Sequence, residues 1–365
     1  MYNQGGTEKI SDNKKICIIG AGASGLAAAI SASRAGAEVC VLEHKKEAGN
    51  KLLLTGNGKC NFTNLKMNSS CYHQNEDSRI SCFLKRFTPE DAISFFEGLG
   101  IKSSEKCGYV YPESGNASDI REALIRAAGN IKTESVITDV ISLRKKYDAI
   151  ILACGSFAAR NTGSDGSGYK MLEQLKIKYT RVLPALCSLR CDTAELMKHF
   201  PGKRFAGRIN VYDGKKIIGT DCGEIQLRDN AISGIPVMNI SRYVSRELYY
   251  KGQTKPNDEW SGEVKIEILP VSEFELPEII RCRNEKPVFI DSSVELTVRH
   301  ISRFSDGQIC TGGVPLEELD DNLQLRNSPG IYVTGEMCDV DGICGGYNLH
   351  WAWLSGILAG KAAAI

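Results

Sequence analysis

The sequence has no apolar run long enough to span a bilayer, and it has no excess of charge of either sign. Lysine plus arginine number 45 against 44 aspartates and glutamates, so the formal net charge is +1. Such a chain has no general electrostatic attraction to nucleic acid or to an anionic membrane. Residues 1–14 are polar and lack the apolar stretch of a signal peptide. We therefore expect a cytoplasmic protein without membrane or nucleic-acid partners, with a flexible N-terminal tail over 1–14.

Cysteine is abundant, with 14 residues, but the spacings that bind metals or form redox pairs are missing. No two cysteines stand in a C-x-x-C arrangement, so zinc ribbons, iron–sulfur motifs and thioredoxin-like pairs have no support. The closest pairs are Cys187 with Cys191 and Cys338 with Cys344. Others, such as Cys17, stand in apolar runs, where a thiol behaves as a small hydrophobic side chain. We expect reduced, mostly structural thiols and no bound metal.

One stretch near the N-terminus combines the features of a dinucleotide-binding fold in the required order. Residues 15–19 form a short β-branched run, typical of a strand buried in a parallel sheet. Residues 20–25 follow as G-x-G-x-x-G, and residues 26–35 have helix-forming character. A second apolar run, residues 38–42, ends in Glu43. Strand, glycine turn, helix, strand and terminal acid together predict a nucleotide site rather than a merely structural turn.

The residue types in this fingerprint have separate physical roles. Gly20 permits the tight turn, Gly22 lets a pyrophosphate approach the backbone, and Gly25 lets the helix pack closely on the strand. The helix N-terminus offers N–H groups and positive partial charge to the phosphates. Glu43 can accept hydrogen bonds from an adenosine ribose and would repel a 2′-phosphate, so FAD or NAD is favoured over NADP. The predicted cofactor contacts in this stretch are Gly20, Gly22, Ala23, Ser24, Gly25 and Glu43.

A second glycine-rich loop follows the fingerprint and carries a more specific signal. Residues 51–61, with the sequence KLLLTGNGKCN, resemble the signature of the BaiN-like (YhiN-like) FAD-dependent oxidoreductases, which have a glutathione-reductase-type FAD domain. The resemblance implies that this loop wraps the flavin end of FAD. The residues implied to lie near the ribityl chain and isoalloxazine are Lys51, Thr55, Gly56, Asn57, Gly58, Cys60 and Asn61.

Further segments match the same family and carry the remaining contacts that the resemblance implies. A strand containing Val136 would present its backbone to adenine, and an apolar strand over 147–155 would end beside the diphosphate. A strand over 330–336 would close the site. A glycine turn before the last helix would direct the positive helix N-terminus at the flavin ring. The implied contacts are Val136, Cys154, Gly155, Gly335, Glu336, Gly345, Gly346, Tyr347 and Asn348.

These signals predict an α/β fold with a discontinuous FAD-binding domain. We expect a Rossmann-like domain of glutathione-reductase type over 15–186 and 305–365, and an inserted β-rich mixed domain over 187–304 that caps the substrate. The insertion is shorter than is usual in the family, which implies a reduced lid. A glycine-rich loop at 163–168 is not preceded by a strand, so a separate NAD domain is not expected. A NAD(P)H donor would therefore bind only transiently.

The functional hypothesis is an FAD-dependent oxidoreductase that transfers a hydride between flavin N5 and a small organic substrate under the inserted domain. The family has been associated with amine oxidation and with reduction of unsaturated steroid-like substrates. The sequence assigns no catalytic residue, substrate or oligomeric state. His350 stands where the family usually has glutamine, and a lone histidine is expected to pack rather than catalyse.

Three other hypotheses are open at this point. An FAD-binding redox sensor or structural flavoprotein would bind the cofactor without turnover. An NAD-dependent dehydrogenase would use the fingerprint directly, although the loop at 51–61 argues against it. A flavoprotein that modifies RNA is disfavoured by the near-neutral charge.

Overall fold

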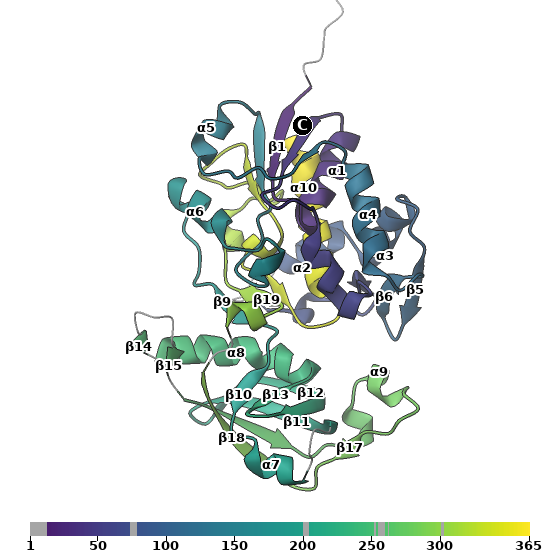
Figure 1. The fold of residues 1–365 in the computed structure, drawn as a ribbon, viewed down its shortest axis with the longest axis vertical. Helices are drawn as coiled ribbons and strands as arrows, with labels where there is room; N and C mark the ends of the chain where they lie inside the picture. The colour runs from purple at the N-terminus through teal and green to yellow at the C-terminus, as the bar shows by residue number, and fades with distance from the viewer. Residues whose placement is uncertain are drawn as a thin grey trace, which may run out of the picture.

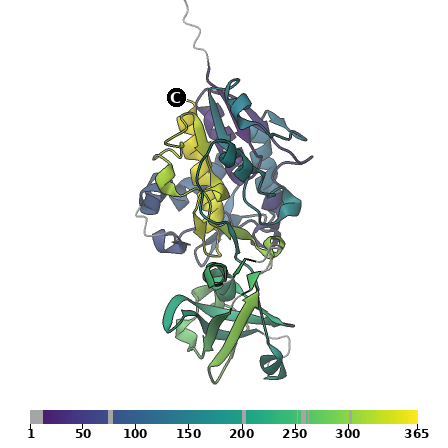
Figure 2. The same ribbon diagram turned by 90° about the vertical axis from the view of Figure 1, so that its left-hand side faces the viewer.

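The protein folds into two bodies, a parallel-sheet body and a smaller β-rich body at one end of it (Figures 1 and 2). A computed structural model describes the residues 13–73, 79–199, 204–251, 253–254, 260–261, 263–300 and 303–365. The predicted flexible tail lies, apart from residues 13 and 14, outside the described residues. Within the described part, none of the helices combines the length and the apolar character that crossing a membrane requires.

A five-stranded parallel sheet organises the larger body. Its strands are, in spatial order, β20 (Ile331–Val333), β8 (Ala149–Leu152), β1 (Lys15–Ile19), β2 (Glu38–Leu42) and β7 (Ile131–Lys132). Every residue of β8 is buried, as are four of the five residues in β1 and in β2. The β-branched and apolar runs of the sequence therefore form the centre of the sheet, where both faces are covered.

Two helices from opposite ends of the chain pack directly on each other beside this sheet. They are α1 (Ala23–Arg34) and α10 (Tyr347–Ala363). An ideal Cβ at Gly356 would lie 2.2 Å from the carbonyl oxygen of Ser24, and one at Gly360 would lie 2.3 Å from that of Ala28. These glycines let the two backbones touch, which brings the C-terminal helix against the start of the chain.

The remaining elements of the larger body surround the sheet. The helices are α2 (Arg79–Arg86), α3 (Pro89–Glu97), α4 (Ala117–Ala128), α5 (Val140–Arg144) and α6 (Ser167–Gln174). A small antiparallel sheet contains β3 (Thr63–Asn64), β5 (Ser103–Lys106) and β6 (Tyr109–Pro112), and β4 (Tyr72–His73) pairs with β21 (Asp341–Gly342). The Thr88 and Asp91 side chains form the capping box of α3.

The predicted strand around Val136 is wrong. Strand β7 pairs with β2 only at Ile131 and Lys132, and the chain then runs irregularly until α5 begins at Val140. Glu134 has a left-handed φ of +54°, which turns the chain out of the extended conformation, although the Glu134 and Ser135 N–H groups still donate to the carbonyls of Lys45 and Glu43. Val136 lies in this irregular segment with 72% of its surface exposed.

The inserted body is a closed antiparallel barrel with one long helix. The barrel strands are, around the ring, β12 (Lys216–Arg228), β13 (Ala231–Ser233), β10 (Leu189–Cys191), β18 (Val294–His300), β16 (Val264–Leu269) and β11 (Arg204–Asp213), which pairs again with β12. A short strand, β17 (Val288–Phe289), runs parallel to β11. Closure pairs each of the six ring strands with two neighbours, whereas the two-residue β17 stands at the end of the sheet. The predicted fold class, a parallel-sheet domain with a β-rich insertion, is confirmed.

Helix α8 (Ile235–Lys251) lies between the barrel and the larger body (Figure 1). Val237, Ile240, Val244 and Leu248 recur at helical spacing and are buried in the barrel core. On the side away from this core, the Ser245 hydroxyl donates to the Pro184 carbonyl at 2.7 Å. Shorter helices in the insertion are α7 (Ala194–His199) and α9 (Glu278–Arg281).

The chain enters and leaves the insertion through two paired strands. These are β9 (Leu183–Ala185) and β19 (Ile309–Thr311), which are antiparallel to each other. They stand close to the predicted limits of the inserted domain at 187 and 304. Because they pair, the two crossings between the bodies are held side by side, next to α8.

Candidate functional site

A cavity of about 870 Å³ begins at the carboxyl ends of the central strands. Ile19 at the end of β1, Leu42 at the end of β2 and Ala153 just after β8 all line it. In parallel α/β sheets this edge is where ligands bind, because strand ends and helix N-termini meet there. From this edge the cavity extends to the inserted body, where Ile235 and Met238 of α8 form part of its wall.

The three fingerprint glycines occupy different environments at this edge. Gly20 has a φ of +102°, and an ideal Cβ there would lie 2.4 Å from the Ala153 carbonyl oxygen. An ideal Cβ on Gly25 would lie 1.9 Å from the Gly20 carbonyl oxygen. Gly22 differs, because it lines the cavity and its ideal Cβ has no atom within 4 Å. The first and third glycines are thus required by packing, whereas the second leaves room for a ligand.

Glu43 is buried, and its carboxylate is held by backbone donors. Oε2 accepts from the Ala21 N–H at 2.8 Å, and Oε1 accepts from the Lys45 N–H at 2.8 Å. The carboxylate also lines the cavity. Because a carboxylate accepts about four hydrogen bonds, it retains capacity for a ligand hydroxyl.

The loop after the fingerprint is tied to the C-terminal part of the chain by Glu336. The Lys51 ammonium lies 2.7 Å from Glu336 Oε2, and the Cys310 N–H donates to Oε1 at 2.8 Å. The Ser156 hydroxyl also donates to Oε1. Four segments that are distant in sequence therefore meet at one carboxylate on the cavity wall.

Most of the predicted contact residues line this one cavity. From the first half of the chain these are Gly20, Gly22, Ala23, Ser24, Glu43, Lys51, Thr55, Gly56, Asn57, Asn61, Val136, Cys154 and Gly155. From the C-terminal part they are Gly335, Glu336, Gly345, Gly346 and Asn348. The fold thus brings together residues from both ends of the sequence, as the predicted site requires.

Four predicted contact residues stand elsewhere than on the cavity wall: Gly25, Gly58, Cys60 and Tyr347. Gly25 is a packing position between α1 and the sheet. Cys60 is fully buried, and burial raises the pKa of its thiol to about 12. Tyr347 packs edge-on against Tyr72, with ring centroids 6.1 Å apart.

The cavity fits an extended dinucleotide such as FAD. The open position at Gly22 leaves backbone accessible beside the N-terminus of α1. On the same wall, the Glu43 carboxylate accepts from two backbone N–H groups and retains capacity for a ligand hydroxyl.

Comparison with known proteins identifies the family. The model of the HI0933-like protein Rossmann domain matches residues 14–362. The chain belongs to the HI0933-like family. The resemblance to the BaiN-like family, which the loop at 51–61 indicates, is thereby confirmed.

Two similar proteins and one solved structure align with nearly all of this chain. A 3-dehydro-bile acid delta(4,6)-reductase of Clostridium scindens is 33% identical, over 96% of this chain and 99% of its own. A ribosomal RNA dihydrouridine synthase of Haemophilus influenzae is 26% identical, over 93% of this chain and 95% of its own. The structure of 3-ketosteroid delta1-dehydrogenase from Sterolibacterium denitrificans has a TM-score of 0.50 and 10% identity, over 96% and 100% of the two chains. That last likeness concerns the fold alone.

The part of the cavity that lies away from the nucleotide turn was not predicted from the sequence. Its wall there includes Tyr109, Tyr111, Leu186, Ile235, Met238, Ile309 and Cys344. A signal existed for the tyrosines, because alternate residues of a strand share a face. In β6, Val110 and Pro112 are buried while the tyrosines at 109 and 111 are partly exposed to the cavity. The α8 residues had no such signal, since only the tertiary fold brings α8 to the cavity.

His350 is a buried packing residue, as expected. Its Nδ1 lies 2.8 Å from the Thr63 hydroxyl and its Nε2 lies 3.0 Å from the Phe87 carbonyl oxygen. Burial lowers the pKa of His350 to about 4. The ring is therefore neutral at physiological pH, with Nε2–H donating to Phe87 and Nδ1 accepting from Thr63.

Proposed function

We propose that this protein reduces a carbon–carbon double bond conjugated to a carbonyl in a small, largely apolar substrate. The observation that carries the proposal is the single cavity that reaches from the nucleotide turn at Gly22 to α8 of the inserted body. A cofactor bound along the turn and the 51–61 loop would leave the α8 end for a substrate. The inserted barrel, through α8, would then act as the cap over that substrate.

The lining of the α8 end supports an apolar substrate. Leu186, Ile235, Met238 and Ile309 all contribute to it. Such a surface binds a hydrocarbon framework by excluding water, and the flexible methionine adapts to different shapes. Polar groups near this end, such as the Gln308 side chain, are available to orient a carbonyl.

The names of the two relatives support the type of reaction. A delta(4,6)-reductase acting on a 3-dehydro bile acid reduces a double bond in conjugation with a ketone. Dihydrouridine synthesis reduces the uracil double bond that is conjugated to a carbonyl. In both reactions a hydride adds to one carbon and a proton adds to its neighbour. FAD, when bound and reduced, supplies the hydride.

The chain itself must hold the cofactor and deliver the proton. We assign the cofactor to the predicted contact residues on the cavity wall, with the N-terminus of α10 stabilising negative charge that develops at the flavin end. Asn348 holds the turn before this helix, since its side chain accepts from the Gly342 N–H at 2.8 Å and donates to the Gly342 carbonyl at 2.9 Å.

Tyr109 is our candidate proton donor. It lines the cavity, and its ring edge lies 3.3 Å from where a Cβ of Gly345 would stand, just before α10. Burial raises the pKa of Tyr109 to about 12, so the phenol stays protonated at neutral pH and can act as an acid. Tyr111 lines the same wall one step further along the strand and lies near Gly56 instead.

A second candidate function is reduction of uridine in RNA, which the ribosomal RNA relative favours. The net charge of +1 and the apolar α8 end favour a small molecule instead.

We place the reaction in the cytoplasm, in keeping with cysteines that form no disulfide.

An acceptor screen tests the proposal. The flavin of the purified protein is photoreduced without oxygen and then mixed with a 3-oxo-4-ene steroid or with ribosomal RNA transcripts. Reoxidation by the steroid, with a saturated product in the mass spectrum, is the expected result. Reoxidation by RNA with formation of dihydrouridine would replace the proposal by the second candidate. Flavin that no organic acceptor reoxidises would favour the sensor hypothesis.

A further inference from the structure

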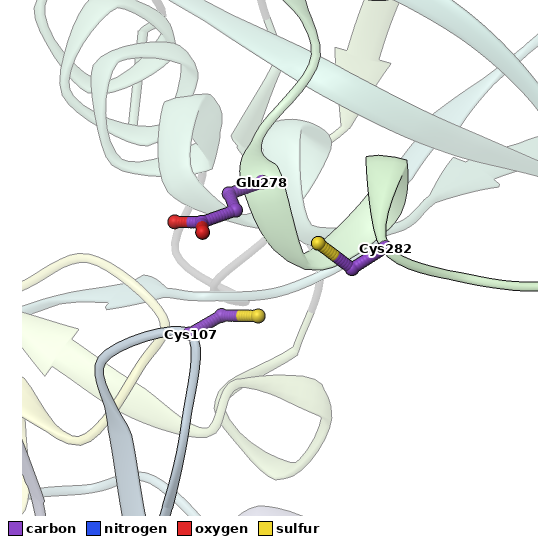
Figure 3. Close-up of side chains that lie close together, drawn as sticks. All are labelled: Cys107, Glu278 and Cys282. Carbon is purple, nitrogen blue, oxygen red and sulfur yellow. The ribbon is translucent and has the colours of Figure 1, made fainter.

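A group of potential metal ligands lies between the two bodies, outside the cavity. The Sγ atoms of Cys107 and Cys282 and a carboxylate oxygen of Glu278 all lie within 4.8 Å of one another. Cys107 belongs to the turn of the β5–β6 hairpin in the larger body, whereas Glu278 and Cys282 belong to α9 and its C-terminus in the insertion (Figure 3). Because Cys107 is far from Glu278 and Cys282 in the sequence, no spacing motif indicated this group of ligands.

Both sides of this group are fixed by local structure. Glu278 and Cys282 are four residues apart, and the Cys282 N–H donates to the Glu278 carbonyl at 2.9 Å, so one helical turn presents both side chains together. Cys107 has a φ of +54°, and its strands pair immediately beside it at Lys106 and Tyr109. Asparagine or glycine is the usual residue in such a turn conformation, so a cysteine there bears a conformational cost.

The charges of the group suit a divalent cation. Two thiolates and the Glu278 carboxylate carry three negative charges, and Lys66, which forms an ion pair with Glu278, carries one positive charge. A divalent cation would bring the net charge of these four side chains and the ion to zero. Thiolate ligands select zinc and similar soft ions over magnesium or calcium.

We propose that Cys107, Cys282 and Glu278 bind one zinc ion that joins the inserted domain to the FAD-binding domain. Ligand atoms around one zinc ion lie roughly 3.7 Å apart, so small rotations of these partly exposed side chains complete the site. Two Zn–S bonds form and two thiol protons leave to solvent, with no change in oxidation state. Solvent fills the fourth position.

This ion would also affect the cavity. Tyr109 follows Cys107 by two residues and lines the cavity wall. Zinc bound to Cys107 would therefore fix this part of the wall relative to the inserted domain. The proposal does not depend on the substrate or on the reaction direction.

Metal titration tests the inference on the full-length, FAD-loaded protein, reduced and freed of metal by a chelator. We expect one zinc equivalent to bind, measured by competition with a chromophoric chelator. Cys107→Ser and Cys282→Ser should each weaken binding about 100-fold or more, and Glu278→Gln about tenfold. Cys82→Ser changes an exposed cysteine on α2 and should bind zinc as the wild type does.

Alkylation provides a second measurement on the unmutated protein. Zinc should protect Cys107 and Cys282 from iodoacetamide while the Cys82 thiol still reacts, as read by peptide mass spectrometry. Failure to bind zinc, or equal binding by both serine variants and the wild type, would overturn the inference. So would a Cys107–Cys282 disulfide that persists after the metal-free protein has been treated with a reductant.

Discussion

The Lys51 ammonium and the Glu336 carboxylate form an ion pair of 2.7 Å between residues that are 285 positions apart. Lys51 belongs to the loop after the nucleotide turn, and Glu336 follows the edge strand β20 near the end of the chain. Both side chains line the cavity, with 28% and 18% of their surfaces exposed. This pair closes one part of the cavity wall by joining segments from the two ends of the chain.

Replacing Glu336 with Ala should therefore weaken both folding and cofactor retention. The substitution removes the acceptor of three donors: the Lys51 ammonium, the Ser156 hydroxyl and the Cys310 N–H. Because partly buried donors would be left unsatisfied, the free energy of unfolding should fall by about 1–3 kcal/mol. Urea unfolding and the fluorescence of released FAD measure the two effects. Glu295→Ala is the control, because it breaks an exposed pair with Lys265 on the barrel and should change neither. Equal behaviour of the two variants would contradict this account.

Gly22 and Gly25 should respond in opposite ways to added side chains. Gly22→Val should fold, because the position has open space and an ordinary φ of −84°, but its side chain would occupy the place of the pyrophosphate. Gly25→Ala should fail to fold, since its Cβ would meet the Gly20 carbonyl oxygen. Circular dichroism and flavin absorbance separate the two outcomes. A folded Gly22→Val protein with full FAD occupancy would disprove the phosphate assignment.

Glu43→Ala should weaken the adenosine half of the site. The variant loses the ribose acceptor and also leaves the Ala21 and Lys45 N–H groups without their partner. We expect the Kd values for FAD and for ADP to rise by about tenfold or more, which corresponds to about 1.4 kcal/mol. Calorimetry on the apoprotein provides both constants, and Glu38→Ala, at the exposed start of β2, is the control. Unchanged ADP binding would exclude the ribose contact.

Tyr109→Phe should lower the rate of substrate reduction while FAD stays bound. Removing a positioned general acid costs roughly 10²–10⁴-fold in rate. Tyr111→Phe is the matched control, with the same chemical change on the same strand face, and should lose less than about tenfold. Single-turnover flavin oxidation measures both. Similar losses in the two variants would show that Tyr109 is not the specific donor.

His350→Gln should make the protein less sensitive to acid. Burial lowers the folded-state pKa of His350 to about 4, against about 6.5 in the unfolded chain, so below pH 6.5 the unfolded state binds a proton that the folded state does not. The free energy of unfolding therefore falls as the pH drops from 6.5 towards 4, by roughly 3 kcal/mol over that window. Glutamine has no such titration, and denaturant unfolding at several pH values should show a shallower decline. Parallel pH profiles would refute the assignment.

The nucleotide half of the site could be predicted from sequence because its signals are local. The run from β1 through Gly20 and Gly25 to Glu43 is about one βαβ unit, in which spacing alone sets the geometry. The strand expected around Val136 failed for the opposite reason. The left-handed conformation of Glu134, with a φ of +54°, ends the extended run before Val136, and no residue pattern in the sequence indicates that turn.

The sequence by itself determined the class of fold, the family and the order of the segments that line the cavity. Only the tertiary structure brought α8 over the far end of the cavity, placed Tyr109 on its wall, and set Cys107 beside Cys282. Glycine spacing and strand periodicity determine the structure of residues that are close together in the sequence, so this local structure can be predicted directly from a sequence pattern. Contacts between the barrel and the parallel-sheet body arise from the packing of two complete cores, and no local pattern in the chain encodes that packing.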